Sequence, residues 1–336
     1  MSDPSAFRSR QIAEQLIGFS VSYQRENLLA RGLGLEHLRE LLLRLARPLL
    51  RHGGSLAYDG DWEETPENFT FDLLRLVSAE RLDDTPAARV NIGQLFCYSP
   101  WPEYHAISKS VEAQWMNCCR ILRINQARAG LAARQQVQVE DLDKRTPRLA
   151  FNAAVTASAM RNAAMAGWYL RAADLEQEFV PPITSRIAMA GSLSGYSGFA
   201  PDLFEEALLT LEARRPLYLL GGLGGAAEVL AKAILETRIP VELTLKWHLE
   251  HTPALRELGD SARRFGLPKG CRSSKALFDA LAVQIRRARR DPAKVLNTGL
   301  NKAMTRELLL TRNVDTAVGL VLAGFVRHSK LPRIAV

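Results

Sequence analysis

The sequence has no apolar run long enough to cross a membrane. Residues 318–326, the best such run near the C-terminus, are far short of the roughly 20 residues that a spanning helix needs. Residues 1–15 are polar and carry no apolar stretch of the signal-peptide type, so we expect a cytoplasmic protein with no membrane partner. Hydrophobic residues make up 47% and charged residues 24% of the chain, which is an ordinary globular composition and excludes disorder as the main state.

Cysteine is scarce as well. The four cysteines are Cys97, Cys118, Cys119 and Cys271, and no two of them form a C-x-x-C pair. We therefore expect reduced, buried thiols, and neither a disulfide framework nor a zinc site.

Two nucleotide-binding motifs are also missing. The pattern G-x-x-x-x-G-K-[ST] does not occur, which excludes a P-loop NTPase. The pattern G-x-G-x-x-G does not follow the first predicted strand, which disfavours an ordinary NAD-dependent Rossmann dehydrogenase.

The positive charge is concentrated in one part of the chain. Residues 241–336 contain 18 Lys and Arg and 8 Asp and Glu, a net charge of +10, whereas the other 240 residues contain 26 and 28, a net charge of −2. A solvated helix face or an oligomer contact is our first interpretation, and a surface for an acidic partner stays open. No aromatic residues interleave with the basic cluster, so nucleic acid is not the partner we expect.

Short apolar segments alternate with helical patterns along the first two thirds of the chain. Strands are predicted at 16–21, 55–58, 89–96, 119–124, 185–190 and 216–220, and helices at 35–50, from 65, and at 153–173, 201–212 and 226–235. This order predicts an α/β fold over residues 14–240: a Rossmann-like parallel sheet of about five to seven strands, with helices on both faces. Residues 241–336 are predicted to form a basic helical annex that packs on this domain through apolar positions such as Leu277, Val283, Leu309 and Val321.

Glycine-rich turns follow the predicted strands at three points. Because the carboxyl ends of parallel strands meet at one edge, and because glycine lets backbone amides approach a phosphate, these turns predict a nucleotide or phosphosugar site. Gly222 in particular is expected to leave the space that a phosphate needs. The predicted ligand-binding residues are Ser20, Ser22, Asp59, Gly60, Asp61, Gly191, Ser192, Gly195, Gly198, Gly221, Gly222, Gly224, Gly225 and Glu228.

The turn after the second predicted strand carries two carboxylates. Asp59 and Asp61 would repel a phosphate and suit a ribose hydroxyl or an amine instead. They are also the candidate ligands for Mg²⁺, but nothing in the pattern indicates a metal or another cofactor.

In this order, the segments LIGFSVS, SLAYDGD, SAMRNAAM, SRIAMAGSLSGYSG and PLYLLGGLGGAAE resemble the SLOG superfamily of Rossmann-like nucleotide-binding proteins, over roughly residues 14–240. That group includes the Lonely Guy phosphoribohydrolases, the DNA-uptake protein Smf/DprA, the sensor region of TRPM-type channels and effectors of bacterial anti-phage systems of the Thoeris kind. The resemblance implies a protein that binds or senses a nucleotide, such as a signal derived from NAD, in anti-phage defence. It also implies a homo-oligomer and leaves room for a partner effector chain.

The Lonely Guy enzymes suggest an alternative function, cleavage of a nucleotide N-glycosidic bond. They carry an arginine on a helix, then a strand, then P-G-G-x-G-T-x-x-E, and Arg161 matches that arginine. The acid matches Glu205 or Glu206 by order and Glu228 by lettering, and we prefer the first pair. The resemblance then implies that Arg161 holds a phosphate and that one carboxylate steadies the oxocarbenium-like sugar. Positions 205 and 206 point about 100° apart on a helix, so we expect one of them to face the pocket.

Overall fold

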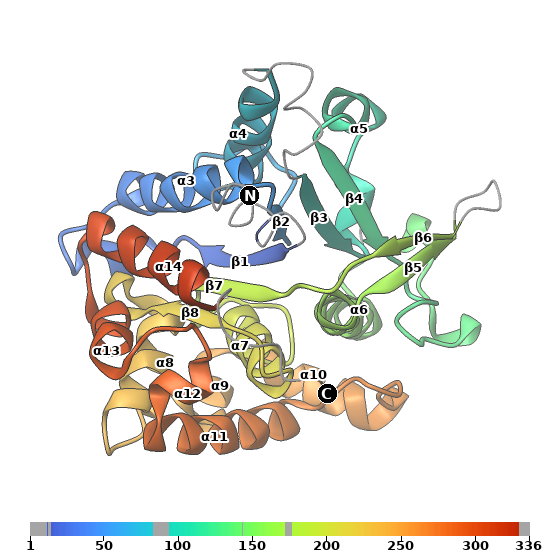
Figure 1. The fold of residues 1–336 in the computed structure, drawn as a ribbon. Helices are drawn as coiled ribbons and strands as arrows, with labels where there is room; N and C mark the ends of the chain where they lie inside the picture. The colour runs from blue at the N-terminus through green and yellow to red at the C-terminus, as the bar shows by residue number, and fades with distance from the viewer. Residues whose placement is uncertain (1–11, 13–14, 83–93, 143, 172–176, 329–336) are drawn as a thin grey trace.

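Six strands form one parallel sheet in the order β4-β3-β2-β1-β7-β8. The computed structural model describes residues 12, 15–82, 94–142, 144–171 and 177–328. The strands of the sheet are β1 (Leu16–Ser22), β2 (Ser55–Tyr58), β3 (Leu95–Pro100), β4 (Cys119–Ile124), β7 (Ser185–Ala190) and β8 (Leu217–Leu220). A separate antiparallel ribbon of β5 (Trp168–Arg171) and β6 (Gln177–Val180) extends away from the sheet in Figure 1.

Helices cover both faces of the sheet (Figure 1), which confirms the predicted Rossmann-like α/β fold. One face is covered by α3 (Leu35–Arg51), α4 (Thr70–Leu82) and α14 (Val314–His328), and the other by α6 (Pro147–Ala166), α7 (Asp202–Glu212) and α8 (Gly225–Leu235). α11 (Ser274–Arg290) packs on the outside of α7 and α8. The remaining helices are α2 (Arg25–Leu29), α5 (Lys109–Trp115), α9 (Leu245–His251), α10 (Ala254–Phe265), α12 (Pro292–Leu296) and α13 (Lys302–Leu310). None of the helices in the described ranges is both long and apolar enough to cross a bilayer.

Apolar side chains of β1 alternate between the two faces of the sheet, so helices must bury both faces. Ile17 and Phe19 pack toward α3 and α14, whereas Leu16 packs in the cluster that includes α6. Ser20 belongs to the same side as Leu16, because side chains two and four residues apart share a face. The strand is therefore apolar throughout most of its length, as expected for a parallel strand buried on both sides.

The helices after residue 240 pack against the rest of the protein. Leu277 on α11 is buried among side chains of α7 and α8, and Val321 on α14 is buried against α3, which lies alongside α14 in Figure 1. Leu309 is buried as predicted. The prediction for Val283 is wrong: its side chain is 43% exposed, because it lies on the outer face of α11.

Three predicted elements differ from the structure. The helix predicted from residue 65 is α4, which begins at Thr70. The third strand runs over Leu95–Pro100 and not over 89–96, of which residues 89–93 lie outside the described residues. The helix predicted over 153–173 is α6, which covers Pro147–Ala166 and ends at Gly167, where φ is +73°. Residues 168–171 then pair with β6 as a strand, so cross-strand pairing overrides the helical pattern.

Candidate functional site

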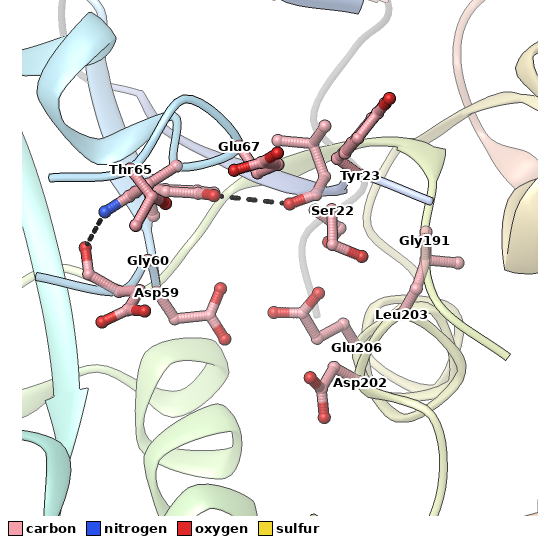
Figure 2. A pocket seen from close by; sticks show the side chains of 15 residues that line it. Ser22, Tyr23, Asp59, Gly60, Thr65, Glu67, Gly191, Asp202, Leu203 and Glu206 are labelled. Atoms are coloured by element: carbon pink, nitrogen blue, oxygen red, sulfur yellow. Dashed lines mark hydrogen bonds between the residues drawn. The ribbon is translucent and has the colours of Figure 1, made fainter. Parts of the chain in front are cut away.

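The strand order reverses between β1 and β7, and a cavity lies at this reversal. From β1 the sheet grows through β2, β3 and β4 on one side, and through β7 and β8 on the other. In an open parallel sheet the loops at such a reversal diverge and leave a crevice at the carboxyl ends of the strands, where ligands bind. Here the crevice holds a cavity of about 310 Å³ (Figure 2).

The cavity brings together seven of the predicted site residues, which come from β1, from the loops that follow β2 and β7, and from α7. These are Ser20, Ser22, Asp59, Gly60, Asp61, Gly191 and Glu206. The rest of the lining was not predicted from the sequence and consists of Val21, Tyr23, Tyr58, Thr65, Glu67, Asn68, Asp202 and Leu203. Asp202 follows Pro201 at the start of α7, a position that the helix pattern could have shown.

The loop after β2 is shaped by hydrogen bonds to the backbone of Asp61. Thr70 Oγ1 and Asn68 Nδ2 donate to the Asp61 carbonyl oxygen, at 2.7 and 2.8 Å. Gly60 allows this close packing, because a Cβ atom there would collide with Thr70 Oγ1. The chain therefore turns tightly after β2 and leaves the carboxyl group of Asp59 among the cavity walls (Figure 2).

Glu206 lies in the cavity wall and is ion-paired with a buried arginine of the sheet. Arg186 Nη1 is 2.9 Å from Glu206 Oε1 and donates to Ser20 Oγ at 2.8 Å, while its Nε donates to Thr210 Oγ1 at 3.2 Å. Arg186 is 2% exposed, on a strand that is otherwise apolar. Sequence reasoning missed it, and the signal was a charged residue inside a buried strand.

Arg161, the predicted phosphate-holding arginine, is enclosed by two carboxylates of α7. Its Nη1 donates to Glu205 Oε2 at 2.8 Å and its Nη2 to Asp202 Oδ1 at 2.7 Å. Burial alone would lower the pKa of Arg161, and the charges of Asp202 and Glu205 more than reverse this, so its pKa is raised. Neither Arg161 nor Glu205 lines the cavity, and Ser158 also donates to Glu205.

The first glycine turn is tied to the loop after β1. The amide of Ser192 donates to Ser22 Oγ at 3.0 Å, and Gln24 Nε2 donates to Ser192 Oγ at 2.6 Å. Gly191 reaches the cavity, whereas Gly195 and Gly198 lie farther along the turn and do not line it.

The second glycine turn packs against other parts of the protein and lines no part of this cavity. A Cβ atom at Gly222 would collide with the carbonyl of Thr311, just after α13, so the space expected there for a phosphate is filled by backbone. Gly221 and Gly225 are also confined by backbone, namely that of Leu309 and of Gly191, whereas a Cβ atom at Gly224 would first meet the guanidinium group of Arg31. Glu228 is ion-paired with Arg31 and with Lys232.

The cavity lining is strongly acidic. It contains the carboxyl groups of Asp59, Asp61, Glu67, Asp202 and Glu206 and no Lys, Arg or His. Burial, and then the charge of Glu206, raises the pKa of Asp59 well above its usual range, against the opposing effect of Arg161 and Arg186. Within the described ranges no three His, Cys, Asp or Glu side chains are arranged to hold a metal ion.

Replacing Asp59 by asparagine is expected to change how stability depends on pH. Folding raises the pKa of this carboxyl group above its value of about 3.9 in the unfolded protein. Its contribution to stability is complete at pH values below the unfolded pKa and is lost as the pH rises through the folded pKa. The Asp59→Asn variant should therefore unfold at nearly the same urea concentration as the unmodified protein at pH 4, and at a clearly higher one at pH 8. The exposed Asp260→Asn variant serves as a control and should show no such divergence. Parallel curves for Asp59→Asn would contradict the assignment.

A parallel α/β sheet with helices on both faces defines a Rossmann-like protein, and its polar cavity lies over the strand-order reversal, where such sheets bind ligands. The family described as SLOG cluster2 matches residues 11–308, and the chain belongs to this family. Membership supports a nucleotide-related function in general. A comparison with curated proteins finds no match.

Proposed function

We propose that this protein binds a nucleotide or a nucleotide-derived signal, such as one made from NAD, in the cavity between β1, β2 and β7, and senses it without cleaving it. The observation that carries the proposal is the position of this cavity at the reversal of strand order, with hydroxyl and carboxyl oxygens converging on it. Membership of the SLOG cluster2 family supports a ligand of the nucleotide class.

The ribose is the part of a nucleotide that these oxygens suit. Carboxylates accept hydrogen bonds from vicinal ribose hydroxyls, the role that an acidic residue plays in dinucleotide-binding folds. Asp59 and Asp202 lie in the cavity wall from different elements, and the hydroxyl of Thr65 adds a group that can donate or accept (Figure 2).

Titration of the full chain with AMP, ADP-ribose and NAD tests this proposal. At least one of them is expected to bind in calorimetry and to raise the melting temperature, because a ligand at about 100 times its Kd stabilises the folded state by about 2.7 kcal/mol. Glu67→Ala, in the cavity wall, should weaken binding, whereas Glu63→Ala, on the same loop but outside the lining, should not. If no member of the panel binds, the proposal is wrong.

A second candidate function, hydrolysis of the N-glycosidic bond, is favoured by the contrast between Asp59 and Glu206. Glu206 is ion-paired with Arg186, while burial raises the pKa of Asp59. Two carboxyl groups in such different environments suit a division of work: a protonated acid gives its proton to the departing base, and a carboxylate steadies the positively charged sugar that water then attacks.

Chromatography after incubation with AMP separates the two functions. Hydrolysis predicts free adenine and ribose 5-phosphate, with little product from Asp59→Asn, because asparagine has no proton to give. Binding without product contradicts hydrolysis and favours sensing.

We extend the sensing proposal to bacterial anti-phage defence, for which phage plating on cells with and without the gene is the measurement.

A further inference from the structure

We propose that the cavity selects a positively charged ribosyl group, namely a ribose joined through its anomeric carbon to a cationic nitrogen ring, and leaves phosphate groups outside. This inference rests on the proposed function, because it takes the cavity as the ribose site and names the chemical class of the ligand.

The balance of charge in the cavity wall is the first observation. Five carboxyl groups line it, and no cationic side chain is among the fifteen lining residues. Asp59 and Glu67 make no ion pair and accept no side-chain hydrogen bond within the described part of the chain. Asp61 Oδ1 accepts from the amides of Trp62 and Glu63, at 2.6 and 3.1 Å, and so caps its own loop.

The two nearby arginines already have partners. Arg186 is 2% exposed and bound to Glu206, and Arg161 is 5% exposed and holds carboxylates with both of its Nη atoms. Turning either guanidinium toward a phosphate would leave a buried carboxylate without its counter-charge. These arginines therefore offset part of the negative charge of the cavity lining, but neither lines the cavity, so neither offers an N–H donor to an anion bound there.

The N-terminal end of α7, which reaches the cavity at Asp202, is also no anion site. Asp202 and Glu205 occupy its first turn, where negative side chains interact favourably with the helix dipole. A phosphate placed there would meet these two carboxylates first.

Size and shape agree with a nucleoside-sized group. A volume of about 310 Å³ is at the lower end of the range of ligand pockets. Figure 2 shows Tyr23 at the edge of the cavity, with its hydroxyl end directed away from Asp202 and Glu206. An aromatic ring at that edge is a group that a flat cationic ring can contact. The hydroxyls of the sugar can then donate to Asp59, which is half-buried, and to the exposed carboxylate of Asp202.

The ionisation of Asp59 adds a pH dependence to this preference. The charged and titratable groups that interact with it are those of two acids, two arginines, two tyrosines and a cysteine: Glu206, Asp202, Arg161, Arg186, Tyr58, Tyr98 and Cys97. Burial raises the pKa of Asp59, so part of the negative charge of the wall appears only as the pH rises. A cation in the cavity favours the ionised carboxylate, and its affinity should therefore increase with pH.

Three ligands of similar shape but different charge show how far the charge of the ligand determines binding. Nicotinamide riboside carries a cationic pyridinium ring, its reduced dihydro form is neutral, and nicotinamide mononucleotide adds a 5′-phosphate. The full-length protein is titrated with each ligand by calorimetry at pH 6 and pH 8, with AMP and adenosine as reference ligands. We expect the cationic riboside to bind at least about tenfold more tightly than the reduced form, and more tightly than the mononucleotide. Its affinity should rise from pH 6 to pH 8 and fall with added salt.

Two variants assign the preference to the cavity. Asp59→Asn should bring the affinities of the cationic and reduced ribosides closer together and remove the pH dependence. Glu63→Gln, an equal loss of charge outside the lining, should leave both unchanged. A melting curve of each variant confirms that the folded protein is being titrated.

The outcomes distinguish this inference from the proposed function. If AMP or the mononucleotide binds most tightly, or if the two ribosides bind equally, the inference is overturned and the proposed nucleotide site stands. If none of the five ligands binds, the inference is overturned, and the titrations with ADP-ribose and NAD then decide whether the proposed nucleotide site stands. A charge preference that Asp59→Asn leaves intact would also overturn the inference.

Discussion

Replacing Arg186 by methionine is expected to lower the free energy of unfolding by about 3–5 kcal/mol, because it leaves the Glu206 carboxylate buried without its counter-charge. Glu206 is 4% exposed and Arg186 Nη1 is 2.9 Å from it, so water from the cavity can replace the lost partner only in part. Ser20 and Thr210 lose a donor as well. Urea unfolding at pH 7 gives the change in free energy.

A double variant shows whether the pair or the arginine alone is responsible. Arg186→Met combined with Glu206→Gln removes both charges and should recover most of the lost stability, because the cost of breaking a buried pair is mainly that of the charge left behind. The exposed pair of Arg263 and Asp260 serves as control, and Arg263→Met should cost under about 1 kcal/mol. Equal small losses for Arg186→Met and Arg263→Met would show that Glu206 does not depend on Arg186.

Replacing Gly222 by alanine is expected to destabilise the protein by about 1–3 kcal/mol or more, the range found when a packed interior is overfilled. The added Cβ atom would collide with the backbone carbonyl of Thr311, which cannot turn away as a flexible side chain can. The turn and the end of α13 must therefore separate. Thermal unfolding gives the size of the effect.

Gly319→Ala on α14 is the matched control, because nothing lies within 4 Å of the Cβ atom it would add. In a helix this change should stabilise by about 0.5–1 kcal/mol. The sequence alone predicted that Gly222 leaves space for a phosphate, so that Gly222→Val would abolish nucleotide binding without unfolding the protein. If a Gly222 variant has normal stability but no longer binds the nucleotide, the second glycine turn is part of the ligand site after all.

Much of the fold could be predicted because its signals are local. The strands at 16–21, 55–58 and 185–190 are short apolar runs, each followed by a turn, and the leucines of α3 recur at helical spacing. The β5–β6 ribbon could not be predicted in this way, because residues 168–171 continue a helical pattern and only pairing with β6 makes them a strand.

The candidate site also combines features that the local sequence predicts with features that only tertiary contacts determine. The residue pattern by itself determined the sheet, its carboxyl edge, and the presence there of Asp59, Asp61 and Gly191, because each of these follows a strand directly. The tertiary structure alone decided which charges are paired. Arg186 meets Ser20 from 166 positions away, and Arg161 meets Glu205 from 44.

The sequence can show that a charged residue such as Arg186 lies in a buried strand, but it does not show which residue is its partner. An ion pair depends on the distance between two atoms and not on their separation along the chain. The same reason explains the second glycine turn. From the sequence, its glycines are equally compatible with a phosphate-binding turn and with close packing of another backbone segment. The structure shows the second arrangement, because the end of α13 packs against the turn.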